Sequence, residues 1–189
     1  MATQRLRLPR VTRRLIVVGA VLIVAALGWR AWLERPASVP PPVAGADSTA
    51  AGLRSVTLWF ASAGGDSLLA ESREMAEEPG VHERVAALVA ALEQGPRQAG
   101  VRTLPPGTLL LHAYLDEAGL LTLDLSRPFR QGFSGGARAE ELVLGSLVRT
   151  VADGMPEAKH IRIVCAGVAL TSLGGHFPLD QPLDPEDWP

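Results

Sequence analysis

A long apolar run near the N-terminus constrains this chain more than any other feature of its sequence. Leu15 to Trp29 contains no charged side chain, and counting on past Arg30 gives nineteen residues, 15–33. At about 1.5 Å of rise per residue, a helix of that length spans roughly the hydrocarbon core of a bilayer. The indole of Trp32 suits the membrane–water interface, and a guanidinium near the end of a span can extend to the same level. We therefore predict one transmembrane helix, acting as a signal anchor, over residues 15–33.

The distribution of charge sets the expected orientation of that helix. The first 33 residues carry six arginines and no acidic residue, whereas the remainder carries twelve basic against twenty acidic residues, a net charge of −8. Because basic flanks stay inside, we expect residues 1–14 as a cytoplasmic tail and the C-terminal body outside the cytoplasmic membrane. A cleaved signal peptide is the alternative, but "ERPAS" is a weak cleavage site and no cysteine follows the run for lipid attachment. So acidic a body excludes nucleic acid as a partner, because phosphates require a basic surface.

Residues 34–52 are predicted to be a linker without a fold of its own. The stretch is rich in Pro, Ala, Ser and Gly, and its three consecutive prolines favour an extended polyproline conformation. About 130 residues follow, enough to bury a hydrophobic core. Cys165 is the single cysteine of the chain. It can form no internal disulfide and leaves no pair for a common zinc site.

Hydrophobic patterning in the body predicts the element order β-β-α-β-β-α-β. One helix is expected within residues 81–94, ended by Gly95 and Pro96, and a second within residues 137–155. The expected strands are residues 54–62, 67–75, 109–116, 120–126 and 159–166, with a short terminal strand within 173–183. Two helices covering one face of a mixed sheet is the economical packing for this order. We therefore predict an α+β fold, a two-layer sandwich.

Residues 132–136, "GFSGG", fit the pattern of a hydrolase nucleophile elbow, which would make Ser134 a nucleophile. An elbow requires the serine on a sharp turn directly between strand and helix. Here the strand is expected to end near Leu125, and Pro128 interrupts any extension, so Ser134 falls inside a loop of about ten residues. Asp153, followed by His160 or His176, satisfies the order of triad partners and nothing more. The favoured interpretation is that these residues form the loop directly before a helix, with Ser134 as a possible N-cap.

Other candidate sites lack the spacing that their chemistry needs. The histidines are scattered one per element at positions 82, 112, 160 and 176, with no metal-ligand spacing. Adjacent acidic pairs, Glu77–Glu78 and Glu140–Glu141, point apart on any regular element and are interpreted as solvated charge. The terminal "DPEDW" lacks the spacing and glycine turn of a calcium loop. We expect no metal, no cofactor and no enzymatic activity.

Several motifs in the body together resemble the GerMN domain family, named for a spore-germination and sporulation protein. "ALVAALEQGP", "LPPGTLLLHAYLDEAGLLTLDLS" and "EELVLGSLVRTVAD" occur in the family's order, and the resemblance covers about residues 54–170. The residues in matching places are Gly95, Pro96, Leu104, Pro105, Gly107, Thr108, Asp124, Ser126 and Thr150. The resemblance implies a small α+β domain similar to ring-building motifs, without established catalytic residues. It also implies a place outside the cytoplasmic membrane, in sporulation, germination or cell-wall assembly.

From the residues and the resemblance together we predict a GerMN-like domain over residues 53–180 and an acidic tail over 181–189. The expected function is a non-catalytic module that binds envelope proteins, or a second copy of itself, through exposed sheet edges and the second helix. A peptidoglycan-binding module is the first alternative. A serine hydrolase that uses Ser134 is the second.

Overall fold

The structure is a computed structural model that describes residues 52–188. The predicted cytoplasmic tail, the predicted transmembrane helix and nearly all of the predicted linker lie outside the described residues. Within the described part, no helix has both the length and the hydropathy that crossing a bilayer requires. Every element below belongs to one compact unit, Thr49–Pro189.

Strands and helices follow one another largely as the sequence predicts. In chain order they are β1 (Leu53–Ala61), β2 (Leu68–Ala76), α2 (Val81–Gln94), β3 (Leu110–Leu115), β4 (Leu120–Leu125), α3 (Arg127–Gln131), α4 (Ala137–Gly154), β5 (His160–Cys165), β6 (Val168–Ala169) and the 3₁₀ turn η1 (Pro185–Asp187). In the two helices expected from the sequence, now α2 and α4, one apolar face is buried. The expected terminal strand reduces to an isolated bridge between Ile161 and Leu183.

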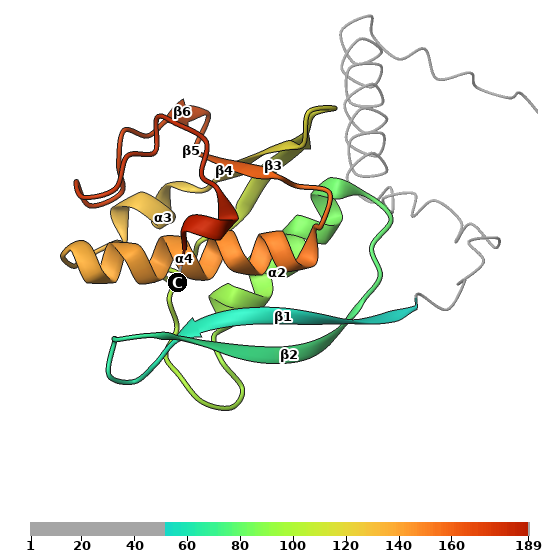
Figure 1. Cartoon of the computed structure of the whole chain (residues 1–189), viewed down its shortest axis with the longest axis horizontal. Helices are drawn as coiled ribbons and strands as arrows, with labels where there is room; N and C mark the ends of the chain where they lie inside the picture. Colours follow the sequence, from blue (N-terminus) through green and yellow to red (C-terminus); the bar gives the residue numbers. More distant parts are fainter. Residues whose placement is uncertain (1–51, 189) are drawn as a thin grey trace, which may run out of the picture. The chain divides into compact units, whose positions relative to one another are not determined.

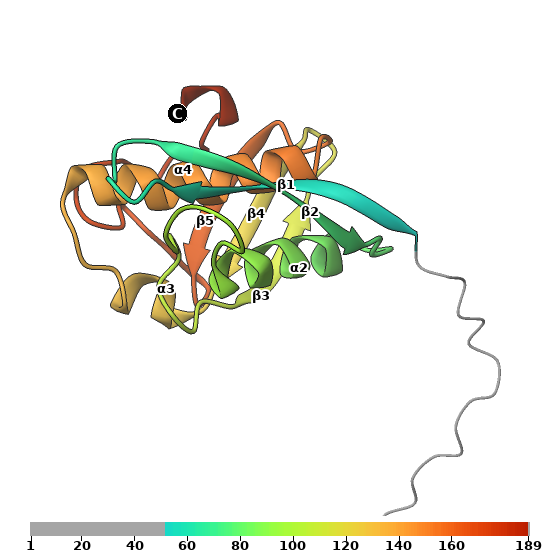
Figure 2. The same ribbon diagram turned by 90° about the horizontal axis from the view of Figure 1, so that it is seen from below.

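The strands form two sheets, which corrects the expectation of one. β3, β4, β5 and β6 make a four-stranded sheet in that order, mixed because β4 and β5 run parallel. β1 and β2 form a separate antiparallel hairpin. Figures 1 and 2 show α2 and α4 between this hairpin and the four-stranded sheet. The fold is α+β as predicted. The two helices, however, pack between the hairpin and the four-stranded sheet instead of covering one face of a single sheet.

Side chains of α4 explain why the hairpin stays apart from the sheet. The backbone N–H of Trp59, in β1, donates to the hydroxyl of Thr150 at 2.9 Å, and the hydroxyl of Ser146 donates to the carbonyl of Trp59. Ser146 also exchanges a hydrogen bond of 2.6 Å with Thr103. At Trp59 the free edge of β1 is therefore satisfied by a helix instead of another strand. Strand addition at this point would have to displace these two bonds.

One hydrophobic core joins both sheets and the helices. Its largest fully buried side chains include Phe60 from β1, Leu88 and Leu92 from α2, and Leu144 and Leu147 from α4. Most of α4 is buried, so only its first turns and a few later positions reach the surface. The second helix is therefore a central core element, and only part of it can contact a partner.

The C-terminal strap, residues 170–188, packs onto the body as a continuous segment. Leu179 and Leu183 belong to the core, and Leu183 exchanges two backbone hydrogen bonds with Ile161 of β5, at 2.9 and 2.7 Å. Trp188 packs against Phe177, with ring centroids 5.5 Å apart. Within the segment predicted as an acidic tail, residues 181–189, Leu183 and Trp188 thus make core contacts.

Glu140 fastens the strap to the first turn of α4. Its carboxylate is fully buried and accepts the backbone N–H groups of Leu173 and Gly174 at 3.0 and 2.8 Å. His176 donates its backbone N–H to the same carboxylate at 2.9 Å, and its Nδ1 lies at 2.9 Å as well. The interpretation of Glu140 as solvated charge was wrong. Its neighbour Glu141 is partly exposed and pairs with Arg138 at 2.6 Å.

The segment between β4 and α4 contains a helix that the sequence patterns did not predict. α3 begins after Ser126 with proline in its first turn, and its Phe129 is fully buried. α4 begins after Gly136, which makes no side-chain cap. Ser134 is therefore not the N-cap, contrary to expectation. It lies in the short connection between α3 and α4.

Candidate binding cleft

The "LPPGT" turn forms one rim of a cleft, and hydrogen bonds within it fix its shape. The hydroxyl of Thr108 donates to the carbonyl of Pro105 at 2.6 Å, and Thr108 is fully buried. The hydroxyl of Ser126 accepts the backbone N–H of Leu109 at 2.9 Å and donates to the carbonyl of Gly107 at 3.2 Å. Gly107 has φ +79°, a left-handed conformation that glycine adopts without strain.

The segment that leads into this turn is held by a buried ion pair. Arg73 contacts Glu71 in β2 and donates to the carbonyls of Ala91 and Gly95, at 3.3 and 3.0 Å, where α2 ends. Glu71 also accepts the backbone N–H groups of residues 97 and 98, at 2.8 and 3.1 Å. Polar side chains of the hairpin therefore position the chain between α2 and the cleft.

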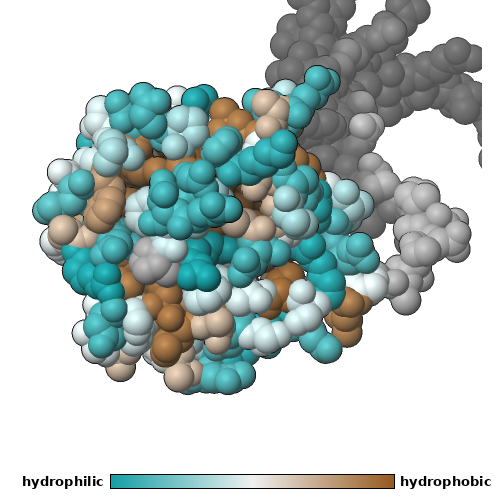
Figure 3. Space-filling view, in the orientation of Figure 1, coloured by the Kyte–Doolittle hydropathy of each residue, from teal (hydrophilic) through white to brown (hydrophobic). Residues whose placement is uncertain are grey.

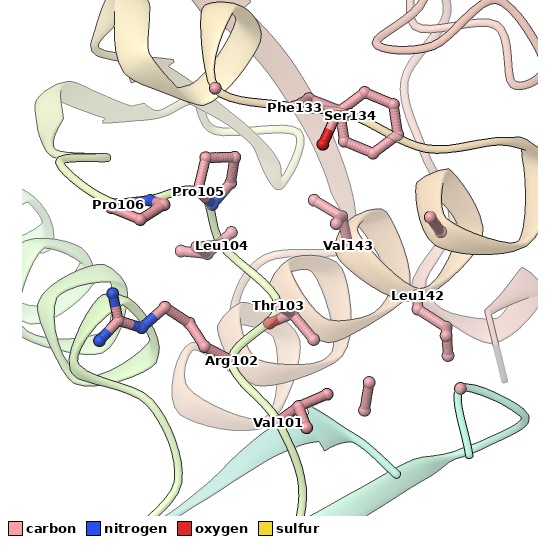
Figure 4. A pocket seen from close by; sticks show the side chains of 14 residues that line it. Val101, Arg102, Thr103, Leu104, Pro105, Pro106, Phe133, Ser134, Leu142 and Val143 are labelled. Carbon is pink, nitrogen blue, oxygen red and sulfur yellow. The ribbon is translucent and has the colours of Figure 1, made fainter. Parts of the chain in front are cut away.

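The cleft itself, of about 350 Å³, lies between this segment and the start of α4 (Figure 4). Apolar side chains from three places make most of its lining. They are Val101, Leu104, Pro105 and Pro106 on one side, Phe133 from the α3–α4 connection, and Leu142 and Val143 from α4. Its size is at the lower end of small-ligand sites and suits one or two protruding side chains of a partner.

The cleft offers few groups for acid–base chemistry. Its lining contains no carboxylate and no histidine. Its one cation, Arg102, points toward α2 in Figure 4, where its guanidinium lies 3.9 Å from Glu93. The hydroxyl of Thr103 already bonds Ser146. The rest of the lining is an apolar surface with the hydroxyl of Ser134 on its border. Such a surface binds other apolar groups because both surfaces lose their contact with water.

One turn beside the cleft carries a perturbed acid. Asp66 follows Gly65, which lines the cleft, and its carboxylate accepts the hydroxyls of Ser62 at 2.6 Å and Ser67 at 3.2 Å. These hydrogen bonds hold the pKa of Asp66 below its ordinary value, with a smaller contribution from the charge of Arg138. Asp66 is exposed and satisfied locally, so it stabilises the β1–β2 turn and takes no part in the cleft's chemistry.

Two of the hypothetical triad partners of Ser134 are bonded to other residues. α3 intervenes between β4 and Ser134, so no strand–turn–helix elbow exists. Asp153 accepts the indole N–H of Trp59 at 2.7 Å, and His176 bonds Glu140. His160 begins β5 and does not line the cleft. None of these three side chains lines the cleft beside Ser134, and the bonds given for Asp153 and His176 are made to other residues.

Replacing Ser134 with alanine should therefore change neither reactivity nor fold. We expect a serine-reactive fluorophosphonate probe to label the wild type and S134A at the same background level. The free energy of unfolding should change by less than about 0.5 kcal/mol, as for most exposed positions. Labelling of the wild type that disappears in S134A would revive the hydrolase alternative.

The remaining motif residues have structural contacts. The α2 terminus at Gly95 has φ +89°, and its N–H bonds the carbonyl of Leu92 at 3.0 Å. Asp124, in β4, accepts the backbone N–H of Gly167 at 3.0 Å and so ties the β5–β6 turn to the sheet. Thr150 bonds the backbone of β1. No cluster of three or more metal-ligating side chains occurs within residues 52–188.

Comparison with known proteins decides the family. Residues 57–171 match the Germane family, described as "Sporulation and spore germination". The chain belongs to the Germane family. The matched segment of this Germane domain extends from β1 to just beyond β6, and so includes the whole cleft. No curated protein matches the chain by sequence.

Solved structures share the fold of this Germane domain. The tandem GerMN domains of the sporulation protein GerM from Bacillus subtilis match at 15% identity, covering 72% of this chain and 48% of that one, with a TM-score of 0.57. The first GerMN domain alone matches at 15% identity over 71% and 99%, with a TM-score of 0.55. A Clostridium perfringens protein, named as a candidate lipoprotein, matches at 24% over 72% and 90%, with a TM-score of 0.51. The GerMN-like fold predicted from the motifs is confirmed.

The motifs in the sequence indicated the rim of the cleft but not the cleft. The motif residues Leu104 and Pro105 line it directly, and Gly107, Thr108 and Ser126 shape its turn. Phe133 stood out in the sequence only as part of the "GFSGG" pattern. One signal in the sequence could have indicated the cleft. Phe133 stands among glycines in a loop, where a large apolar side chain is exposed unless another group packs on it.

Proposed function

We propose that this chain is a membrane-anchored, extracytoplasmic module that acts without catalysis by binding a protein of the cell envelope. The observation that carries the proposal is the cleft. It is apolar, it is bordered by a rigid hydrogen-bonded turn, and its lining holds no carboxylate or histidine. Such a surface recognises shape and apolar area, as protein interfaces do at their centres.

Val101, an exposed residue at the mouth of the cleft, is the best position at which to test the proposal by mutation. Val101 is 46% exposed, although its N–H bonds the carbonyl of Ala61 at 2.8 Å. An apolar side chain at the mouth of an apolar cleft adds surface that a bound partner can cover. A partner that inserts an apolar loop beside Val101 would bury it together with Phe133 and Leu142. The partner's chemistry is therefore apolar at its centre.

The place in the envelope is supported by the sequence and by relatives. The apolar run at residues 15–33, with arginines before it and an acidic body after it, favours a single span with the body outside. The Clostridium perfringens relative is named as a candidate lipoprotein, and lipoproteins are held at a membrane surface. We propose an analogous position for this chain, with a helix in place of a lipid. The family description further supports a role in sporulation, germination or a related envelope process.

Replacing Val101 with glutamate should abolish partner recovery without unfolding the domain. In-cell crosslinking of the tagged full-length chain, followed by quantitative mass spectrometry, should show at least about a tenfold loss of the captured envelope proteins. A charge placed in an apolar contact costs roughly 2 kcal/mol or more. Circular dichroism should be unchanged, because Val101 contributes little to the core.

The matched control is Leu53→Glu at the opposite end of β1. Leu53 is 70% exposed and lies about 27 Å from Ala61, at roughly 3.4 Å per strand residue. L53E should recover the same partners as the wild type. Equal recovery by V101E and the wild type would contradict the cleft as the binding surface. Sedimentation of the wild type with purified sacculi, with no protein captured, would instead favour the peptidoglycan alternative.

A further inference from the structure

A second concave surface lies on the C-terminal strap and shares no lining residue with the cleft. It is a groove of about 300 Å³, bordered by Glu141 of α4 and by strap residues from Phe177 to Trp188. Its apolar walls are Phe177, Trp188, Pro178 and Pro182. The two aromatic rings are tilted by 48° with centroids 5.5 Å apart, so they form a corner instead of a flat stack.

The polar border of this groove is rich in acidic groups. Its lining includes the carboxylates of Glu141, Asp184 and Asp187 and no basic side chain. Arg138 partly neutralises Glu141 at 2.6 Å, and the carboxylate of Asp184 accepts one backbone N–H of η1 at 3.0 Å. Within residues 52–188, Asp187 makes no side-chain hydrogen bond or ion pair. Figure 3 shows hydrophilic and hydrophobic residues side by side on the face of the domain that Figure 1 presents to the viewer.

This combination of groups selects one kind of occupant. Aromatic faces attract cations, and a guanidinium does so best because it is planar, weakly hydrated and able to stack. The same guanidinium can donate two parallel hydrogen bonds to a carboxylate such as that of Asp187. Exposed proline and aromatic walls receive an extended backbone without requiring it to supply hydrogen bonds. An acidic or neutral ligand would leave the carboxylates desolvated and unpaired.

We propose that this groove binds an extended, arginine-bearing segment of a protein partner, with the guanidinium seated between the Phe177–Trp188 corner and the carboxylate of Asp187. This goes beyond the proposed function, because it assigns a second surface with a different chemistry. The strap holds the groove in place through the buried bonds of Glu140, so the walls are preformed. Preformed walls reduce the entropic cost of binding.

The test uses the unit Thr49–Pro189, which contains every residue of the core and is expected to fold alone. The probe is a fluorescein-labelled peptide of alternating proline and arginine, compared by fluorescence anisotropy with the same peptide carrying citrulline. We expect saturable binding of the arginine peptide and at least about tenfold weaker binding of the citrulline peptide, the size of effect expected from losing a charged pair. Equal binding of both peptides, or no binding of the arginine peptide, would overturn the proposal.

Two charge reversals on the same strap supply the matched variants. Asp187→Lys should weaken binding at least about tenfold. Asp180→Lys, at an exposed carboxylate that does not line the groove, should leave it within about twofold. V101E should also bind normally, which separates a failure here from a failure of the cleft. Binding of spermine with the same affinity and the same sensitivity to Asp187→Lys would indicate a small-polycation site and overturn the peptide assignment.

Discussion

Replacing Glu140 with alanine should lower the free energy of unfolding by about 3–5 kcal/mol, because three backbone N–H groups lose their acceptor at roughly 1–3 kcal/mol each and water recovers part of that cost. The wild-type carboxylate is fully buried and accepts bonds from Leu173, Gly174 and His176. In E140A these donors lose their acceptor, and each must either stay unsatisfied or pull the strap into water. Urea unfolding followed by circular dichroism measures the loss. We expect increased proteolysis between residues 170 and 188 as well.

The adjacent residue provides a control of identical chemistry. Glu141→Ala removes a carboxylate from the same helical turn, but that carboxylate is partly exposed and pairs only with Arg138. Its removal should cost less than about 1 kcal/mol, as for most exposed ion pairs. Similar losses for E140A and E141A would show that the bonds to the strap contribute nothing beyond surface charge, and Glu140 would then not be what fastens the strap.

The same carboxylate should make stability depend on pH. Burial, the largest single influence, raises the pKa of Glu140, but the hydrogen bonds from Gly174, His176 and Leu173 together outweigh it and hold the pKa below its ordinary value of 4.5. A lowered pKa in the folded state means that this stability is present above about pH 4.5. It is lost as the pH falls through the folded-state pKa. The pH dependence of unfolding below pH 4.5 should therefore be shallower in E140A than in the wild type.

Replacing Arg73 with methionine should cost a comparable amount, about 3–5 kcal/mol. The change would leave Glu71 buried without its cationic partner and would remove the donor to the carbonyls of Ala91 and Gly95. It would also remove the guanidinium that lies 5.6 Å from the ring centroid of Phe60. Chemical denaturation measures the loss. Arg138→Met, at an exposed ion pair, should cost less than about 1 kcal/mol.

A double variant separates the ion pair from the other contacts of Arg73. Glu71→Gln with Arg73→Met removes both charges, so the penalty for a buried unpaired carboxylate disappears. The double variant should be more stable than the sum of the two single losses predicts. If the two losses instead add exactly, Glu71 and Arg73 are not energetically coupled, and the buried ion pair does not stabilise the fold as a pair.

Most of the fold could be predicted because it follows from local patterns. Apolar residues at helical spacing determine α2 and α4, and alternation determines the β3–β4 hairpin and β5. The placement of the first hairpin could not be predicted in this way. It depends on Thr150 and Ser146 bonding the backbone of Trp59, which lies about ninety positions away in the chain. α3 was missed because five residues carry too little periodicity to indicate a helix.

Buried charges were the hardest features to predict. Glu140 and Glu71 look like surface residues in the sequence, because acidic side chains are almost never fully buried unless partnered. Their partners are largely backbone N–H groups, which carry no sequence signature, and these come from residues 173–176 and 97–98. The cleft was hidden for a related reason. Its walls come from three segments that meet only in the folded domain.

Site-specific photo-crosslinking in cells tests most directly whether the cleft binds a protein. A photoreactive phenylalanine analogue is placed at position 101 of the tagged full-length chain, and in a parallel strain at position 53. If the cleft binds an envelope protein, irradiation should give a discrete adduct from position 101, identified by mass spectrometry, and none from position 53. No adduct from position 101, or the same pattern from both positions, would contradict the cleft as a protein-binding surface.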